Sequence, residues 1–163
     1  MELVQQLLKV LAVAHAAGLV HRDIKLDNLF MATAEDGRRV LKILDFGIAK
    51  VLPSAAGLEP PAMRTSEGVI LGTPRFIPPE QVIGRDVDAR ADLYGAGVVL
   101  YQLLAGRDPF YEIEETAPLL RAAVLEAPPL PSRVAPQPIE LAVETVVTRA
   151  LAKRPEDRYA SAD

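Results

Sequence analysis

Three short polar motifs, in a fixed order, constrain this chain more than any other feature. The first is the octapeptide HRDIKLDN at residues 21–28, the second is Asp-Phe-Gly at residues 45–47, and the third is Pro-Pro-Glu at residues 78–80. Their Asp and Asn side chains carry the hard oxygen ligands that suit Mg²⁺. We therefore expect the functional site where the fold brings these motifs together.

The first two motifs are separated by the pattern of a β-hairpin. Residues 29–31 and 40–44 are short apolar stretches that predict two strands, and Glu35-Asp36-Gly37 between them is a turn signal. The second and third motifs enclose residues 45–80, an irregular segment rich in proline and glycine. A loop of this length inside a compact domain is usually functional.

The rest of the chain predicts helices. Apolar residues at helical spacing indicate a first helix with a broad buried face, which Gly18 ends. Asp88 is a suitable N-cap for a helix up to Gly106 that is apolar nearly all round, as expected of a central buried helix. Further helices are expected over residues 116–125 and from Pro138 onwards, with the proline in the first turn.

Composition narrows the class of protein. The chain has 163 residues, half of them apolar, which is enough for one domain with a substantial core. A net charge of −4 argues against a nucleic-acid-binding surface. The absence of cysteine excludes disulfides, and two histidines are too few for a histidine-based zinc site. The longest apolar run is shorter than the roughly 20 residues that span a bilayer. We expect a cytoplasmic domain without a membrane segment, although a longer parent protein could be membrane-anchored.

In this order the three motifs resemble the catalytic loop, the metal-binding loop and the end of the activation segment of a eukaryotic-type (Hanks-type) serine/threonine protein kinase. The spellings Asp-Phe-Gly-Ile-Ala-Lys and Gly-Thr-Pro-Arg-Phe resemble bacterial members of that family. The resemblance covers residues 1–163 and implies an α+β, protein-kinase-like fold. Only the mainly α-helical C-terminal lobe is expected, with a short β-hairpin at the catalytic loop and an activation segment at residues 45–80.

The resemblance also implies roles for individual residues. Asp23 would accept the proton of the acceptor hydroxyl, and Lys25 would contact the phosphate that is transferred. Asn28 and Asp45 would hold Mg²⁺ and with it ATP, the two expected cofactors. Phe30 would form the apolar floor under the adenine ring, although it could equally be an ordinary core residue of a strand.

Four residues are implied to act in regulation or in acceptor binding. Arg22 would pair with a phosphate on Thr65 or Ser66 and so order the activation segment, unless these hydroxyls are incidental features of a surface loop. Thr73 would hydrogen-bond the catalytic aspartate and lysine. Its neighbours, from Gly72 onwards, resemble the loop that receives the residue after the phosphoacceptor.

A last group is implied to be structural: His21, Phe46, Gly47, Glu80, Asp92 and Arg158. His21 and Phe46 would stack in the spine that links the two lobes of an active kinase. Glu80 and Arg158 would form a buried ion pair, and Asp92 would brace the backbone of the catalytic loop.

Several parts of the kinase pattern have no counterpart in the sequence. There is no Gly-rich GxGxxG loop, no strand lysine of the Val-Ala-Ile-Lys type and no assignable glutamate of the helix that pairs with it. We therefore expect the N-terminal lobe to be absent and to be a missing partner of this chain. Because positioning supplies most of the catalysis in phosphoryl transfer, the chain alone is expected to be weakly active or inactive.

Two other functions remain open. The chain could be a non-catalytic, pseudokinase-like binding module, but a scaffold does not need all four of Asp23, Lys25, Asn28 and Asp45. It could instead be a small-molecule phosphotransferase of similar fold. The long activation segment and the Pro-Pro-Glu region favour protein substrates with Ser or Thr. The identity of those substrates, the activating signal and any attached sensor domain are not encoded in these motifs.

Overall fold

The computed structural model of the chain describes residues 2–44 and 74–163. Six of the expected site residues lie outside these ranges: Asp45, Phe46, Gly47, Thr65, Ser66 and Thr73. The described elements are, in order, α1 (Glu2–Ala16), η1 (Leu26–Asn28), β1 (Leu29–Thr33), β2 (Arg39–Ile43), η3 (Pro74–Phe76), α2 (Pro79–Val82), α3 (Arg90–Ala105), α4 (Thr116–Leu125), η4 (Pro131–Arg133), α5 (Leu141–Ala150) and η5 (Pro155–Asp157). The described part is thus mainly helical, with one small sheet, as the sequence predicted.

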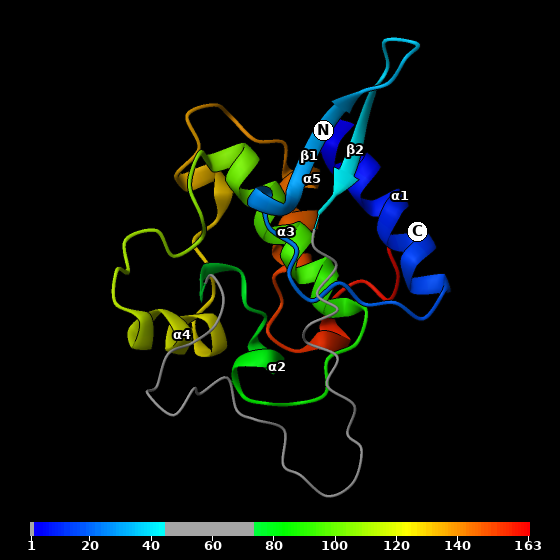
Figure 1. The fold of residues 1–163 in the computed structure, drawn as a ribbon. Coiled ribbons are helices and arrows are strands. Elements are labelled where there is room, and N and C mark those ends of the chain that lie inside the picture. Colours follow the sequence, from blue (N-terminus) through cyan, green and yellow to red (C-terminus); the bar gives the residue numbers. More distant parts are fainter. Residues whose placement is uncertain (1, 45–73) are drawn as a thin grey trace, which may run out of the picture.

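Helix α3 is the centre of the packing, and Figure 1 shows it surrounded by the other elements. It packs against α1 on one side and α5 on another. Its residues join two apolar clusters, because Val98 belongs to the one that includes Val147 of α5 and Val99 to the one that includes Leu11 of α1. All four of these side chains are fully buried. The prediction of a central buried helix is confirmed.

Two glycines allow neighbouring segments to reach the backbone of α3. A Cβ atom added at Gly95 would lie 2.8 Å from the Cβ of Ile24, which follows the HRD motif. A Cβ added at Gly97 would lie 2.8 Å from the Cβ of Ala150 in α5. Because real Cβ atoms do not approach so closely, these two positions require glycine or a shift of the neighbour. The segment that follows the HRD motif therefore packs directly on the α3 backbone.

The ends of α3 follow ordinary capping chemistry. The N-cap position of α3 is Ala89, one residue after Asp88, which the sequence predicted for this role. A side-chain oxygen of Asp88 nevertheless accepts a hydrogen bond of 2.8 Å from the backbone N–H of Arg90, the first residue of the helix. At the other end, Gly106 takes a left-handed backbone conformation with a φ of 71° and donates to the carbonyl of Gln102. Among the described residues, no helix is both long and apolar enough to cross a membrane.

The hairpin β1–β2 is antiparallel, with Leu29 opposite Ile43 and Met31 opposite Leu41. These four side chains lie on the face that packs on the α1–α3 cluster. Gln6 of α1 fastens the hairpin further, because its side-chain carbonyl accepts a hydrogen bond of 2.8 Å from the backbone N–H of Leu41. Both predicted strands are present. Strand β1 continues to Thr33, beyond the predicted residues 29–31, and β2 covers residues 39–43 in place of the predicted 40–44.

The last part of the chain differs from the sequence prediction in one detail. Helix α4 occupies residues 116–125 as expected, but α5 begins at Leu141, so Pro138 precedes the helix and does not lie in its first turn. Glu140 supplies the extended backbone that an N-cap position needs, with φ and ψ of −63° and 137°. The proline-rich connector therefore stays extended for longer than its proline positions suggested.

Candidate active site: the HRD loop and its supports

The backbone of the HRD motif is held by one buried carboxylate, that of Asp92 in α3. One oxygen of Asp92 accepts a hydrogen bond of 2.8 Å from the N–H of His21, and the other accepts one of 2.7 Å from the N–H of Arg22. The Asp92 side chain is 1% exposed. A buried carboxylate with such donors is held in place, because moving it would leave charge without partners.

Arg22 has an uncommon backbone conformation that explains why the loop needs this support. Its φ of 66° lies in the left-handed region, and it is the one non-glycine residue of the described chain with a positive φ. For an L-residue this conformation costs roughly 1–2 kcal/mol. Hydrogen bonds to a charged acceptor typically contribute about 1.5–3 kcal/mol. The bonds to Asp92 are therefore large enough to hold the turn in its strained form.

His21 connects the loop to the strand end that precedes Asp45. Its ring is fully buried. The Nδ1 atom accepts a hydrogen bond of 3.3 Å from the backbone N–H of Asp23, so the proton lies on Nε2 and is donated to the carbonyl of Leu44 at 3.2 Å. The N–H of Leu44 in turn donates to the carbonyl of Asn28 at 2.8 Å. Leu44, the residue just before the Asp-Phe-Gly motif, is thus tied to the HRD loop by two hydrogen bonds.

Asp23, Lys25 and Asn28 come together at the end of this loop. The Nζ atom of Lys25 lies 3.3 Å from Oδ2 of Asp23, and Nδ2 of Asn28 lies 3.1 Å from the same oxygen. Nδ2 of Asn28 also donates to the Asp23 backbone carbonyl at 2.8 Å. The Asp23 and Lys25 side chains are 25% and 16% exposed, whereas Asn28 is 7% exposed. A carboxylate, an ammonium group and an amide therefore converge at a partly open position.

The donor set fits a hard cation, although the second expected ligand is not described. The amide orientation of Asn28 directs Nδ2 to Asp23, so Oδ1 is its atom of the type that Mg²⁺ prefers. Residues 2–44 and 74–163 contain no group of three His, Cys, Asp or Glu side chains that could hold a metal ion. A complete magnesium site would thus have to include residues outside these ranges, such as Asp45.

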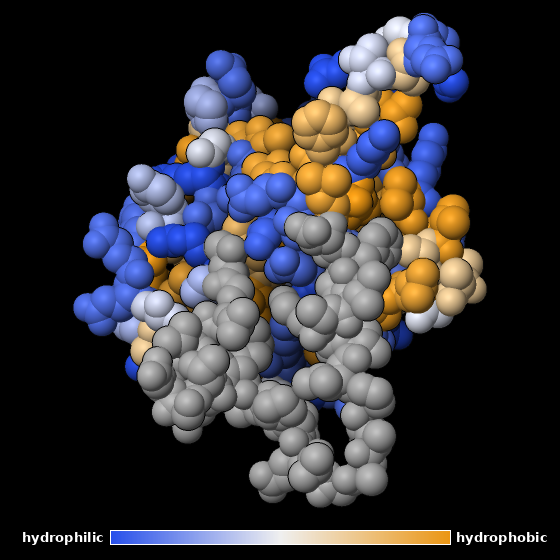
Figure 2. Space-filling view, viewed as in Figure 1, coloured by the Kyte–Doolittle hydropathy of each residue, from blue (hydrophilic) through white to orange (hydrophobic). Residues whose placement is uncertain are grey.

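The expected adenine-floor residue, Phe30, lies on the outer face of the hairpin. Its side chain is 56% exposed, and Val40 and Leu44 nearby in the hairpin are 38% and 46% exposed. Figure 2 shows apolar side chains gathered around the base of the hairpin, whereas the left of the same view is mainly polar. This face can accept an apolar or aromatic group.

Glu80 and Arg158 form the expected ion pair. Both guanidinium nitrogens Nη1 and Nη2 lie 2.7 Å from the Glu80 carboxylate oxygens, and the two side chains are 3% and 0% exposed. The same guanidinium donates to the backbone carbonyls of Arg90, Ala152 and Lys153. These bonds connect the end of the third motif to the start of α3 and to the C-terminal segment.

Two titratable neighbours of this buried ion pair, Tyr94 and Lys153, have shifted pKa values. The Arg158 guanidinium lies 4.9 Å from the centre of the Tyr94 ring, and burial raises the pKa of Tyr94 to about 12. Burial, together with the nearby Arg158 charge, lowers the pKa of Lys153 to about 8. The Lys153 ammonium group donates to the carbonyl of Ala123 at 2.7 Å, near the C-terminus of α4. Burial is the largest cause of both pKa shifts.

Sequence reasoning did not assign His15 a partner. Its Nε2 atom lies 2.8 Å from Oδ2 of Asp92, so it is the third group, with two backbone N–H groups, that contacts this carboxylate. The ring is 11% exposed. His15 and Asp92 are far apart in the chain, and no local sequence pattern reports such a contact. His15 therefore joins α1 to the support of the HRD loop.

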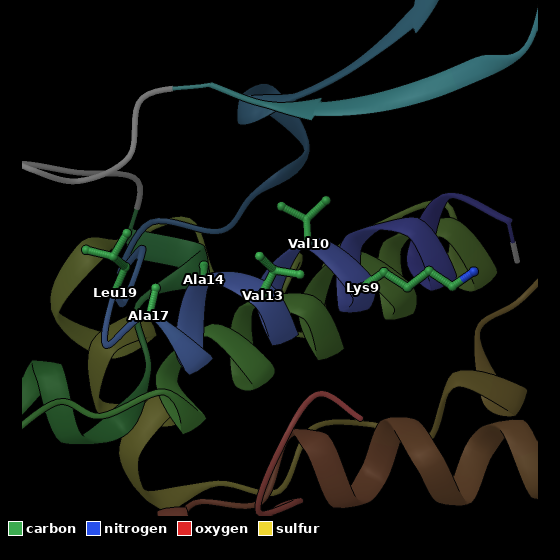
Figure 3. A pocket seen from close by; sticks show the side chains of 6 residues that line it. All are labelled: Lys9, Val10, Val13, Ala14, Ala17 and Leu19. Atoms are coloured by element: carbon green, nitrogen blue, oxygen red, sulfur yellow. The ribbon is translucent and has the colours of Figure 1, made fainter.

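A large apolar hollow lies elsewhere, on the outer face of α1. It has a volume of about 450 Å³ and is lined by Lys9, Val10, Val13, Ala14, Ala17 and Leu19 (Figure 3). The lining is almost wholly aliphatic, and none of the expected site residues within the described ranges contributes to it. A catalytic site needs convergent polar groups, so this hollow is not the candidate active site.

The fold and the HRD loop are those of the helical lobe of a protein kinase. The family model of the protein kinase domain matches residues 1–163, and the chain belongs to this family. It is 50% identical to the serine/threonine-protein kinase Pkn1 of Myxococcus xanthus over 96% of the chain. It is 41% identical to pkn3 of the same organism over 99% of the chain, and 40% identical to PksC of Streptomyces coelicolor over all of it. The chain spans only 21%, 29% and 27% of the lengths of these relatives.

We predict that Glu80→Gln strongly destabilises the fold. The substitution leaves the Arg158 guanidinium charged and buried without its carboxylate, and breaking a buried pair in this way typically costs about 3–5 kcal/mol. The free energy of unfolding, measured by urea denaturation, checks the prediction. Glu156→Gln is the matched control, because Glu156 pairs with Arg154 at the exposed surface and its loss should leave the midpoint unchanged. Equal midpoints for the two variants would contradict the assigned role of the buried pair.

Proposed function

We propose that this chain forms the acceptor-binding and metal-binding side of a serine/threonine protein kinase, which transfers the γ-phosphate of ATP to hydroxyl groups of proteins. The observation that carries the proposal is the convergence of Asp23, Lys25 and Asn28 on a loop whose backbone is fixed by buried Asp92. Phosphoryl transfer depends mainly on positioning and on electrostatic stabilisation. A rigid loop that presents these three groups supplies both.

Asp23 and Lys25 have complementary tasks in this proposal. The Asp23 carboxylate is partly exposed. It takes the proton of the substrate hydroxyl and so orients the hydroxyl oxygen for attack on phosphorus. The Lys25 ammonium group, 3.3 Å away, offsets negative charge on the phosphate that is transferred. Asn28 holds the Asp23 carboxylate in place through its amide N–H group. A small displacement of any of them should therefore slow transfer.

Asn28 and Asp45 would hold magnesium, and Phe30 would contact the adenine of ATP. When bound, Mg²⁺ neutralises charge on the phosphate oxygens and fixes their position. The hydrogen bond from His21 Nε2 to the carbonyl of Leu44 ties the residue just before Asp45 to the HRD loop, which supports this assignment. The exposed position of Phe30 on the hairpin leaves its ring open to a ligand.

The acceptor is proposed to be a protein because of the segment that ends at Glu80. Thr73 and its neighbours would receive the residue after the phosphoacceptor, and the buried Glu80–Arg158 pair anchors the end of that segment. The Gly-rich loop and strand lysine that cover the nucleotide in this family would come from a further lobe. We propose that the present chain without such a lobe transfers phosphate weakly or not at all.

We further propose that phosphorylation of Thr65 or Ser66 regulates the site through Arg22. The strained backbone of Arg22 is fixed by Asp92, so its side chain starts from a defined position beside the catalytic aspartate. A phosphate that pairs with this guanidinium gains charge-assisted hydrogen bonds.

Phosphosite mapping of the active protein tests this regulation. We expect a phosphate on Thr65 or Ser66, and we expect the double Ala variant to lose at least about tenfold in activity, equivalent to about 1.4 kcal/mol. Arg22→Lys should reproduce part of that loss, because lysine cannot form the bidentate contact. Full activity with neither hydroxyl phosphorylated would show that the segment is regulated in another way.

Calorimetric titration of Mg·ATP into the 163-residue chain tests the proposed function itself. We expect binding that requires magnesium and that weakens about tenfold or more in Asp45→Ala, since one metal ligand is removed. Asp36→Ala, in the exposed hairpin turn, is the control and should bind as the unsubstituted chain does. Binding that is unchanged by Asp45→Ala or by removal of magnesium would contradict the proposal. If a protein that also carries the nucleotide-covering lobe binds Mg·ATP but transfers no phosphate, the non-catalytic binding module is favoured instead.

A further inference from the structure

A smaller cavity lies between the connection from α3 to α4 and the chain that follows α4. It has a volume of about 220 Å³ and is lined by residues 107–113, by four residues of the stretch 126–134 and by Tyr101 of α3. None of the expected site residues within the described ranges lines it. This cavity is therefore separate from the candidate active site.

Tyr101 supplies this cavity with a polar group that the protein itself leaves unused. The residue is 1% exposed, yet its hydroxyl makes no hydrogen bond in the part of the chain that the structure describes. Burial raises the pKa of Tyr101, so the hydroxyl stays protonated and uncharged at neutral pH. Because buried polar groups nearly always have a partner, a free hydroxyl beside a cavity indicates that the partner is a molecule that enters it.

The charged residues of the lining leave little for a charged ligand to bind. Nη1 of Arg107 lies 3.7 Å from Oε1 of Glu112, and Nη1 of Arg75 lies 2.9 Å from Oδ1 of Asp108. Glu126, the remaining charged residue of the lining, is exposed to solvent, which screens its charge. An uncharged ligand therefore fits this cavity better than an ion does.

The rest of the lining is aromatic or aliphatic and includes Phe110, Tyr111, Ile113 and Val134. Two of these residues are fixed in place, because Arg75 donates hydrogen bonds to the backbone carbonyls of Phe110 at 3.0 Å and Ile113 at 2.9 Å. Aromatic rings pack well on such surfaces in offset or edge-to-face contact. The cavity therefore offers a formed apolar wall.

The size of the cavity limits the ligand to a small ring system. An apolar cavity of about 150 Å³ can hold one benzene molecule. A volume of about 220 Å³ therefore has room for one ring or two fused rings. One water molecule, which occupies roughly 30 Å³ of the liquid, would fill only a small part of it.

We propose that this cavity binds a small, uncharged aromatic molecule whose ring packs against Phe110 and Val134 and whose one N–H or O–H group hydrogen-bonds to the Tyr101 hydroxyl. Such a ligand gives the hydroxyl its missing partner and leaves the ion pairs of the lining intact. The site does not depend on the proposed function, because no residue that lines it has a role in phosphoryl transfer.

Titration of indole into the 163-residue protein, followed by NMR of the side-chain methyl groups, tests the inference. We expect saturable binding with a dissociation constant of about 1 mM or lower, and the largest shifts at the methyl groups of Ile113 and Val134. Tyr101→Phe removes only the hydroxyl and should weaken binding about fivefold, because one hydrogen bond is lost. Since that hydroxyl has no partner in the free protein, this variant should not lower the midpoint of urea unfolding.

Ala127→Phe adds a ring at an exposed position of the lining and should weaken binding about tenfold or more by filling the cavity. Ala16→Phe is the matched control, because Ala16 is exposed on α1 and does not line the cavity. Binding that is unchanged in both Tyr101→Phe and Ala127→Phe overturns the inference. Shifts confined to Val10 and Val13 also overturn it, because they place indole in the hollow of α1. The absence of saturable binding up to about 10 mM indole has the same consequence.

Discussion

The site depends above all on the buried carboxylate of Asp92. It lies on the central helix and binds the backbone N–H groups of His21 and Arg22, which hold the HRD loop in a strained left-handed turn. The ring of His15 contacts the same carboxylate from α1. A single charged group thus joins two helices and the loop that carries the candidate catalytic residues, and removing it would release all three contacts together.

The remaining supports of the site converge on the same helix. Because Gly95 has no side chain, Ile24, which follows the HRD motif, can pack against the α3 backbone. Arg158 donates a hydrogen bond to the carbonyl of Arg90 at the start of the helix. Through Arg158, Glu80 at the end of the Pro-Pro-Glu motif is tied to that start as well. The HRD loop and the Pro-Pro-Glu motif are therefore both fixed to one rigid element. Such an arrangement would suit the proposed reaction, which depends on positioning.

The sequence predicted the helices, the hairpin and the partnership of Glu80 with Arg158, because apolar periodicity and family motifs report local structure and recurrent pairs. It did not predict the contacts of Gln6, His15 or Arg75. Each of these joins segments more than 30 residues apart by a side chain whose type is also common on exposed surfaces. The start of α5 was misplaced because proline tolerates both a helical first turn and the extended connector found before Leu141. The expectations for Asp45, Thr65, Ser66 and Thr73 concern residues outside the described ranges and remain proposals.

Hydrogen exchange of individual backbone amides, measured by NMR, tests the central role of Asp92 most directly. If the carboxylate holds the HRD turn, the amide protons of His21 and Arg22 exchange as slowly as those in the middle of α3. In Asp92→Asn they should become fast while the α3 amides stay protected. Exchange of both amides in the unsubstituted protein at the rate of the exposed turn at residues 35–37 would contradict this account.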